Sequence, residues 1–479
     1  MKRFLALLIA FYFTFTAVCA FAEGPGGDPP GDPPGGGMDA PPNGAPPDGF
    51  GGGTPPDGAP GNGGFGGGTP PGGRSSSVEY SAAAEITDTA ELTGQIFSSD
   101  TADESALIVN TSDAVTIIDP AVTKTGDSDG GDNCSFYGLN AALLVMGGSV
   151  AAITGGTVAS DANGANGVFS YGGNGGRNGA GGDGTTVIIS DTVITTTGDG
   201  SGGIMTTGGG ITYASDLTIE TSGRSSAAIR TDRGGGTVVV DGGSYTTNGL
   251  GSPVIYSTAD ITVSNAALKS NLSEGVCIEG KNTVTLIDCD MTAGNTQCNG
   301  HASFYDTIMI YQSMSGDADS GTSAFTMTGG SLTSLSGHMF HVTNTHAVIT
   351  LKGVDLVNEG SGVLLSVCDD GWSGAENIAE LVADAQVLAG TFLVGDDSVL
   401  KLTLSNGSSF EGCIGGEIVN AKGTTVSTEV GTVSVVLDGT STWTLTADTY
   451  ITSFDGDAGN VIGNGYTLYV NGAALEGIR

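Results

Sequence analysis

Residues 186–207 read TVIISDTVITTTGDGSGGIMTT, and residues 237–258 read TVVVDGGSYTTNGLGSPVIYST. Each segment holds three short runs rich in Val, Ile, Tyr and Thr, separated by Gly, Asp, Asn and Ser. The runs alternate apolar and polar residues, a period typical of β-strands, and their common order indicates a structural repeat. One repeat cannot bury its apolar side alone, so we expect successive repeats to stack.

The repeat extends in both directions from these segments. Comparable segments recur about every 22–26 residues and begin at Thr186, Ile211, Thr237, Ile261, Thr283, Ala324 and Val348, with a longer step before Ala324. Three strands per coil of this length predict an all-β fold, a right-handed parallel β-helix. Gly and Asn at the corners supply backbone angles that other residues disfavour. Glycine-rich insertions at 126–140 and 174–184 predict loops that protrude from one corner.

The N-terminus has the pattern of an export signal. Two basic residues precede an uncharged apolar run over residues 4–18 and the motif Ala20-Phe-Ala22. This predicts a signal peptide at 1–22 that is cleaved after Ala22, and hence an extracellular or cell-surface protein. A membrane anchor is disfavoured because the run is shorter than the ~20 residues that span a bilayer. A lipid-modified Cys19 is disfavoured by the bulky Val18 before it.

Three further segments differ in composition. Residues 23–77 are nearly all Gly, Pro, Asp, Asn and Ala, which predicts a disordered linker. Residues 78–375 carry the regular repeats and are expected to form the parallel β-helix. Residues 376–479 are less regular and are expected to form the C-terminal coils and cap.

Charge and cysteine content exclude several classes of protein. The chain has 14 Lys and Arg against 51 Asp and Glu, and loss of the signal peptide changes its net charge from −37 to −39. This charge disfavours nucleic acid, anionic membranes and polyuronates as direct partners. No later stretch is long and apolar enough to cross a membrane. The six cysteines after the signal peptide form no CxxC pair, which argues against a zinc ribbon and leaves disulfides and free thiols both open.

The repeats resemble a known group of proteins. Residues 235–243 (GGTVVVDGG) and 264–268 (SNAAL) resemble the pectate-lyase-like superfamily of right-handed parallel β-helices, and more closely secreted adhesin-like and carbohydrate-binding members. Leu437–Thr446 and Gly465–Val470 are similar to the last coils of autotransporter passengers. The resemblance implies the fold and an extracellular, non-catalytic glycan-binding function. No barrel translocator or sortase-type motif is visible, so we do not expect a whole autotransporter, and the mode of attachment is open.

The third strand of each coil carries the candidate binding residues. If its apolar residues point inward, the residues between them form two columns on the outer face, with about 4.8 Å between coils. Aromatic rings can contact the C–H side of a pyranose, and charged groups can bind its hydroxyls. The predicted glycan-binding strip comprises a first column of Phe169, Arg230, Tyr256, Glu279, Tyr311 and His341, and a second column of Tyr171, Asp232 and Lys281. The alternative is a solvated face, or one covered by the long insertions.

Two other functions stay open. The pectate-lyase-like resemblance implies a calcium-dependent polysaccharide lyase as the main alternative, with Arg230 or Lys281 as proton abstractor. Two carboxylates, Asp232 and Glu279, are few for its metal. The second alternative is a structural surface spacer with no ligand.

One acidic loop has calcium-like spacing. Asp127, Asp129 and Asp132 offer oxygen ligands, but the distal Glu of an EF-hand loop is missing. They make calcium a candidate cofactor, and an ordinary Asp-Gly turn is the alternative.

Overall fold

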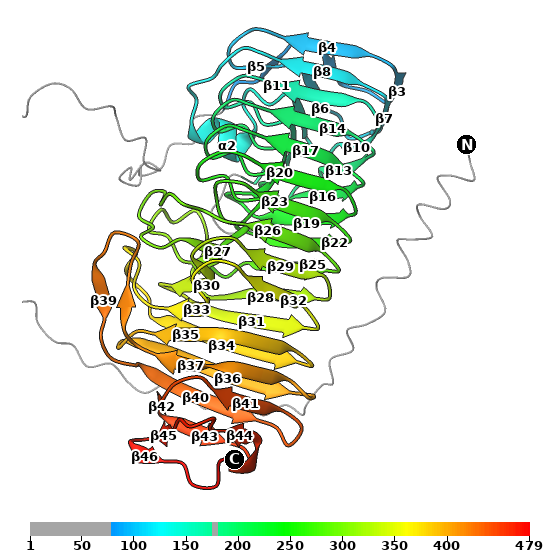
Figure 1. Cartoon of the computed structure of the whole chain (residues 1–479). Coiled ribbons are helices and arrows are strands. Elements are labelled where there is room, and N and C mark those ends of the chain that lie inside the picture. The colour runs from blue at the N-terminus through cyan, green and yellow to red at the C-terminus, as the bar shows by residue number, and fades with distance from the viewer. Residues whose placement is uncertain (1–77, 175–180) are drawn as a thin grey trace, which may run out of the picture. The chain divides into compact units, whose positions relative to one another are not determined.

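The computed structural model describes residues 78–174 and 181–479, and their strands wind into stacked coils (Figure 1). The predicted signal peptide, the predicted linker at 23–77 and part of the insertion at 174–184 lie outside the described residues. The all-β parallel β-helix is confirmed, because successive coils pair strand to strand in three long parallel sheets.

Each coil contributes its strands to these sheets in a fixed order. Sheet 1 is formed by β3 (Ala90–Thr93), β7 (Ala114–Ile118), β10 (Val150–Thr154), β13 (Thr186–Ser190), β16 (Gly210–Ser215), β19 (Gly236–Asp241), β22 (Asp260–Ser264), β25 (Thr283–Ile287), β28 (Thr322–Thr328), β31 (His346–Lys352), β34 (Asn377–Asp384), β36 (Ser398–Ser405), β40 (Thr432–Leu437) and β43 (Ser453–Asp455). Sheet 2 is formed by β4 (Ile96–Ser99), β8 (Ala121–Lys124), β11 (Thr157–Ser160), β14 (Val193–Thr196), β17 (Thr218–Thr221), β20 (Ser244–Thr247), β23 (Ala267–Ser270), β26 (Asp290–Ala293), β29 (Ser331–Ser334) and β32 (Asp355–Asn358). Sheet 3 is formed by β2 (Glu85–Ile86), β6 (Leu107–Asn110), β9 (Leu143–Met146), β12 (Val168–Tyr171), β15 (Ile204–Thr207), β18 (Ile229–Thr231), β21 (Ile255–Ser257), β24 (Val276–Glu279), β27 (Asp306–Tyr311), β30 (His338–Thr343), β33 (Val363–Val367), β35 (Val387–Val394), β37 (Ser409–Gly415), β41 (Thr442–Leu445) and β44 (Val461–Ile462).

The remaining elements lie outside the long sheets. They are the pair β1 (Ser81–Ala82) and β5 (Glu104–Ser105), the hairpin β38 (Ile418–Val419) and β39 (Thr425–Ser427), the helix α2 (Asp132–Tyr137), the 3-10 turn η1 (Ala458–Asn460), and a small sheet of β42 (Thr449–Ile451), β45 (Leu468–Val470) and β46 (Ala473–Ala474). In the view of Figure 1, α2 and the long loops project on the left side of the coils.

The interior is filled by alternate residues of every strand. In β13, Val187 and Ile189 are buried while their neighbours are partly exposed. Near the C-terminal end Phe392, Phe410 and Trp443 occupy successive coils, with ring centroids 4.9 and 5.5 Å apart. All six described cysteines are free thiols.

The corner between sheets 1 and 2 is a two-residue turn with a left-handed residue. Its φ is +49° to +55° at Asp191, Asp216, Asn265 and Asp288. Glycine takes the same place in other coils, for example Gly242 with φ of +74°. Only glycine, and to a lesser degree Asn and Asp, adopts this conformation readily, which explains the predicted Gly and Asn at the corners.

These corners also stack tightly on one another. In three places a glycine lies over the carboxylate of the preceding coil, so that an added Cβ would stand 2.1–2.3 Å from a carboxylate oxygen; the pairs are Asp119 and Gly155, Asp216 and Gly242, and Asp288 and Gly329. At these places a Cβ would oblige the carboxylate of the neighbouring coil to turn aside, in addition to the strain of its own positive φ.

Replacement of Gly242 by Ala tests this double requirement, with Gly353→Ala as the matched control. Gly353 has φ of +60° at the equivalent corner after β31, but nothing lies within 4 Å of its added Cβ. We expect Gly353→Ala to lower the free energy of unfolding by about 1–2 kcal/mol, the cost of a left-handed alanine. Gly242→Ala should lose up to about 1 kcal/mol more, because the carboxylate of Asp216 has to turn aside to admit the Cβ. Urea unfolding of both variants measures the difference, and equal losses would contradict it.

Candidate functional site

The predicted strip follows the outer side of sheet 3. Phe169 and Met205 pack in a hydrophobic cluster separate from the solenoid core, so their side chains point away from the interior. The prediction that the strip is exposed is wrong: Phe169 and His341 are 0% exposed, Glu279 is 2% and Arg230 is 8% exposed. Asp232 is also buried, Tyr171, Tyr256 and Tyr311 are half-buried, and Lys281 is exposed.

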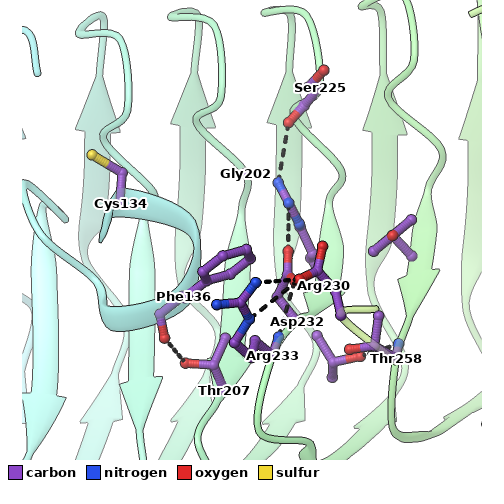
Figure 2. A network of polar contacts seen from close by, with 12 residues as sticks. Cys134, Phe136, Gly202, Thr207, Ser225, Arg230, Asp232, Arg233 and Thr258 are labelled. Atoms are coloured by element: carbon purple, nitrogen blue, oxygen red, sulfur yellow. Dashed lines mark hydrogen bonds and ion pairs between the residues drawn. The ribbon is translucent and has the colours of Figure 1, made fainter. Parts of the chain in front are cut away.

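Insertions cover this face, as the alternative interpretation of the strip expected. Helix α2 from the insertion at 126–140 lies over it, and the backbone oxygen of Phe136 accepts a hydrogen bond of 2.7 Å from Thr207 (Figure 2). Further along, Phe304 packs on His341 with ring centroids 4.7 Å apart. The hairpin of β38 and β39 closes over that loop, since Ile418 is buried against Phe304.

The register of sheet 3 also differs from the prediction. Tyr256 pairs with Cys277, and Glu279 pairs with Tyr311, so Glu279 and Tyr311 belong to the second outer column and not to the column of Tyr256. The physical reason lies in β24 and β27, each of which has two inward apolar residues, such as Val276 and Ile278. A slip of two residues keeps every side chain on its face, so alternation alone does not exclude it.

Arg230 and Asp232 form a buried ion pair at the centre of this face. Arg230 Nη2 donates to Asp232 Oδ2 at 2.6 Å, and Nη1 donates to the backbone oxygen of Ser225 at 3.3 Å (Figure 2). The guanidinium carbon lies 5.4 Å from the ring centroid of Tyr256. Burial disfavours the charged guanidinium, but Asp232, Tyr256 and Asp317 together outweigh this effect and hold the pKa of Arg230 above its ordinary value. Arg230 is thus a fixed, paired cation, which is unsuited to abstract a proton.

Arg233 links the ion pair to two covering segments. Its guanidinium carbon lies 4.1 Å from the ring centroid of Phe136 in α2. The same guanidinium binds Asp317 in the loop between β27 and β28. In that loop Asp319 also binds Lys281, at 2.8 Å. Both residues of the lyase hypothesis, Arg230 and Lys281, are therefore ion-paired.

Glu279 is the second polar centre. Its carboxylate accepts hydrogen bonds from Tyr256, from Tyr311 at 3.3 Å and from Ser313. Burial raises the pKa of Glu279 above its ordinary value, against the lowering effect of the Ser313 and Tyr256 hydroxyls. These contacts hold the start of the 312–321 loop on the sheet.

His338 and His341 form the third polar centre with Ser366. Both imidazoles place Nδ1 2.7 Å from Ser366 Oγ, and His341 Nε2 lies 3.4 Å from Asp370 Oδ2. The Ser366 hydroxyl can donate to only one of the two imidazoles, so the other imidazole must donate to the Ser366 oxygen. Asp370 favours the proton on His341 Nε2; Ser366 then donates to His341, and His338 Nδ1 donates to Ser366. Asp370 also accepts from the backbone N–H of Ser303, at 2.6 Å.

A partly exposed aromatic patch lies in this region, formed by Tyr311 at the end of β27 and by His301 and Trp372 on loops. The ring centroid of Trp372 is 5.1 Å from that of Tyr311 and 6.0 Å from that of His301. Trp372 and Tyr311 are half-buried, and His301 is exposed. Met314 borders the patch, is 55% exposed, and has its sulfur 3.9 Å from the hydroxyl of Ser373.

The acidic loop offers no assembled metal site. Asp127 accepts a hydrogen bond of 2.8 Å from the backbone N–H of Asn163, and Asp132 begins α2. Within residues 78–174 and 181–479, no three His, Cys, Asp or Glu side chains, those of Asp127, Asp129 and Asp132 included, are grouped so that they could hold a metal ion.

Sequence reasoning missed the partners that other coils bring to the strip. Phe304, Asp317 and Asp370 come from loops of irregular length, so their place over sheet 3 follows from no repeat. The one available signal was the long step of the repeat before Ala324, which requires an insertion next to β27.

No family model, characterised protein or solved structure matches this sequence. The resemblance to pectate-lyase-like and adhesin-like β-helices therefore stays a prediction. Among the described residues, no helix is long and apolar enough to cross a membrane.

The buried ion pair gives a stability prediction. Asp232→Ala leaves Arg230 charged and uncompensated, and we expect it to lower the free energy of unfolding by about 3–5 kcal/mol. The control Lys281→Ala breaks a mostly exposed pair and should change it by less than about 1 kcal/mol. Arg230→Met combined with Asp232→Leu should recover most of the loss of Asp232→Ala. Urea unfolding measures all three, and similar losses for Asp232→Ala and Lys281→Ala would refute the importance of the buried pair.

The histidine centre gives a pH prediction. Burial, and secondarily His341, lowers the pKa of His338 from 6.5 to about 3. Between these values the unfolded chain binds the proton more readily, so His338 makes the fold less stable as pH falls from 6.5 towards 3, by up to about 1.4 kcal/mol per pH unit. The difference in free energy of unfolding between the parent and His338→Phe, measured from pH 7.5 to 4, should change with this slope. A difference independent of pH would contradict it.

Proposed function

We propose that this chain is a non-catalytic, extracellular glycan-binding protein, adhesin-like in type, whose ligand binds at the aromatic patch of His301, Tyr311 and Trp372. The observation that carries the proposal is a group of three partly exposed rings in edge-to-face and tilted contact, one at the end of β27 and two on loops that lie beside sheet 3. The originally predicted strip serves mainly as the support of these loops, because Arg230 is paired with Asp232 while Lys281 and Glu279 are bonded to residues of the 312–321 loop.

The chemistry of the patch suits a sugar. Rigid aromatic side chains offer a flat apolar surface at a low cost in conformational entropy, and they can contact the C–H face of a pyranose. Met314 extends the apolar surface, while the hydroxyls of Ser315 and Ser373 lie close by in the sequence as partners for sugar hydroxyls. The side chain of Tyr311 is held in place on sheet 3, because its hydroxyl is bonded to Glu279.

The charge of the chain favours neutral glycans. The formal net charge is −37, so polyuronates and sulfated chains would be repelled unless cations bridged the contact. A calcium-dependent lyase is less well supported, because its candidate bases are paired and the described residues offer no group of three metal ligands. A structural spacer would account for the buried network but gives no role to the exposed rings.

Trp372→Ala tests the proposal. On an array of neutral glycans we expect binding to fall by about tenfold or more, since a central aromatic side chain often dominates a binding site. Melting temperature should stay close to that of the parent, because Trp372 belongs to loops outside the solenoid core.

The control is Leu335→Ala, which removes a 44% exposed apolar side chain from the loop after β29. It should leave both binding and melting unchanged. Unaltered binding by Trp372→Ala would exclude the patch as the site. Release of ultraviolet-absorbing unsaturated products from polyuronates would favour the lyase instead.

A further inference from the structure

The small sheet of β42, β45 and β46 lies close to the C-terminus (Figure 1). It carries a pair of stacked tyrosine rings. The rings of Tyr450 and Tyr469 are nearly parallel, with an angle of 6° between their planes and 4.6 Å between their centroids. Tyr450 is 52% exposed, whereas the neighbouring Ile451 and Leu468 are buried. The two tyrosines therefore stand on the outer face of this sheet.

The next position along the same face is occupied by a methyl group. Tyr469 pairs with Ala474 of β46, so the series across the sheet is Tyr450, Tyr469, Ala474. The turn between β45 and β46 is Asn471-Gly472, with φ of +48° and +80°, which is the sequence and geometry of a tight hairpin. Ala474 is exposed, and the hairpin fixes it beside Tyr469. One ring stacks on Tyr469 from the side of Tyr450. On its other side the sheet offers only the methyl group of the exposed Ala474, and the place above that methyl group is the open position of the series.

We propose that this open position is a sugar-binding subsite, in which the C–H face of a neutral pyranose stacks on Tyr469 above Ala474. The proposal rests on the glycan-binding function proposed above but concerns a separate site. Strands in a sheet are about 4.8 Å apart, so the space beside Tyr469 has the thickness of one ring. The hairpin fixes Ala474 beside Tyr469 before any ligand binds, which lowers the entropy lost on binding.

Two properties of the surroundings favour a neutral sugar over other occupants. Acidic residues flank the face in the sequence, with Asp448 before Tyr450 and Glu476 after Ala474, which disfavours anionic ligands. The exposed aromatic surface of Tyr450, Tyr466 and Tyr469 is on the order of 250 Å². A stable interface with a second copy needs about 800 Å² from each partner, so a single ring matches the surface better than a protein does.

Ala474→Tyr is the decisive variant, because it fills the open position with a third ring of the series and leaves both existing rings in place. Tyr469→Ala removes the platform, and Tyr466→Ala removes an exposed tyrosine that is outside the series. The probes are cellohexaose, mannohexaose and xylohexaose, titrated calorimetrically against the full chain. For at least one probe we expect the affinity to fall about tenfold or more in Ala474→Tyr and Tyr469→Ala, and to be unchanged in Tyr466→Ala. Ala474→Tyr should melt at or above the temperature of the parent.

The outcomes separate this subsite from the aromatic patch. Loss of affinity in Trp372→Ala with parental affinity in a folded Ala474→Tyr overturns the subsite and leaves the patch. Parental affinity in Trp372→Ala with loss of affinity in a folded Ala474→Tyr supports the subsite and excludes the patch as the site. If the parent binds none of the three probes, the subsite is overturned. A dimer seen by light scattering in the parent and lost in Tyr469→Ala would identify a second copy as the occupant, and so would also overturn it.

Discussion

The left-handed corner between sheets 1 and 2 is the constraint on which the rest of the structure depends. A chain that leaves one sheet and enters the next within two residues needs a positive φ, which restricts the position mainly to Gly, Asn and Asp. Each corner must also fit the corner before it, as Gly242 fits over Asp216. The stacked corners thereby align the coils along one edge. This alignment sets the register of the strands of sheets 1 and 2.

The loops at the two ends of the sheet 3 strands are not constrained by this corner, and their lengths vary from coil to coil. Helix α2, the Phe304 loop, the 312–321 loop and the Trp372 loop each precede or follow a strand of sheet 3. A long loop costs little more in closure entropy than a short one, so insertions are tolerated at these places once the corner has aligned the coils. They fold back over sheet 3, and the polar residues beneath them must then find partners in the loops.

This division explains which features the sequence could predict. Alternation and corner residues are local, so the three sheets and the inward side chains, such as Val187, could be predicted from them. The register at Glu279 could not, because β24 carries two inward apolar residues and a shift by two keeps both inside. The partners of Arg233 could not be predicted either, because Asp317 and Phe136 lie in segments that obey no repeat. For the same reason His301 and Trp372 are far apart in the chain but adjacent in space.

The buried charges on sheet 3 have a consequence for any ligand site above them. A buried ion pair is seldom better for stability than apolar residues of similar size, but it restricts what can pack on it, because an unpaired charge is costly. The guanidinium of Arg233 needs a loop that carries a carboxylate, such as that of Asp317. The carboxylate of Glu279 needs a loop that carries hydroxyl donors, such as that of Ser313. Tyr311 contacts both the buried network and the aromatic patch, because its hydroxyl is bonded to Glu279 and its ring packs against Trp372. Tyr311 therefore ties the proposed site to the buried network, and the residues first predicted as a binding face hold the loops around that proposed site.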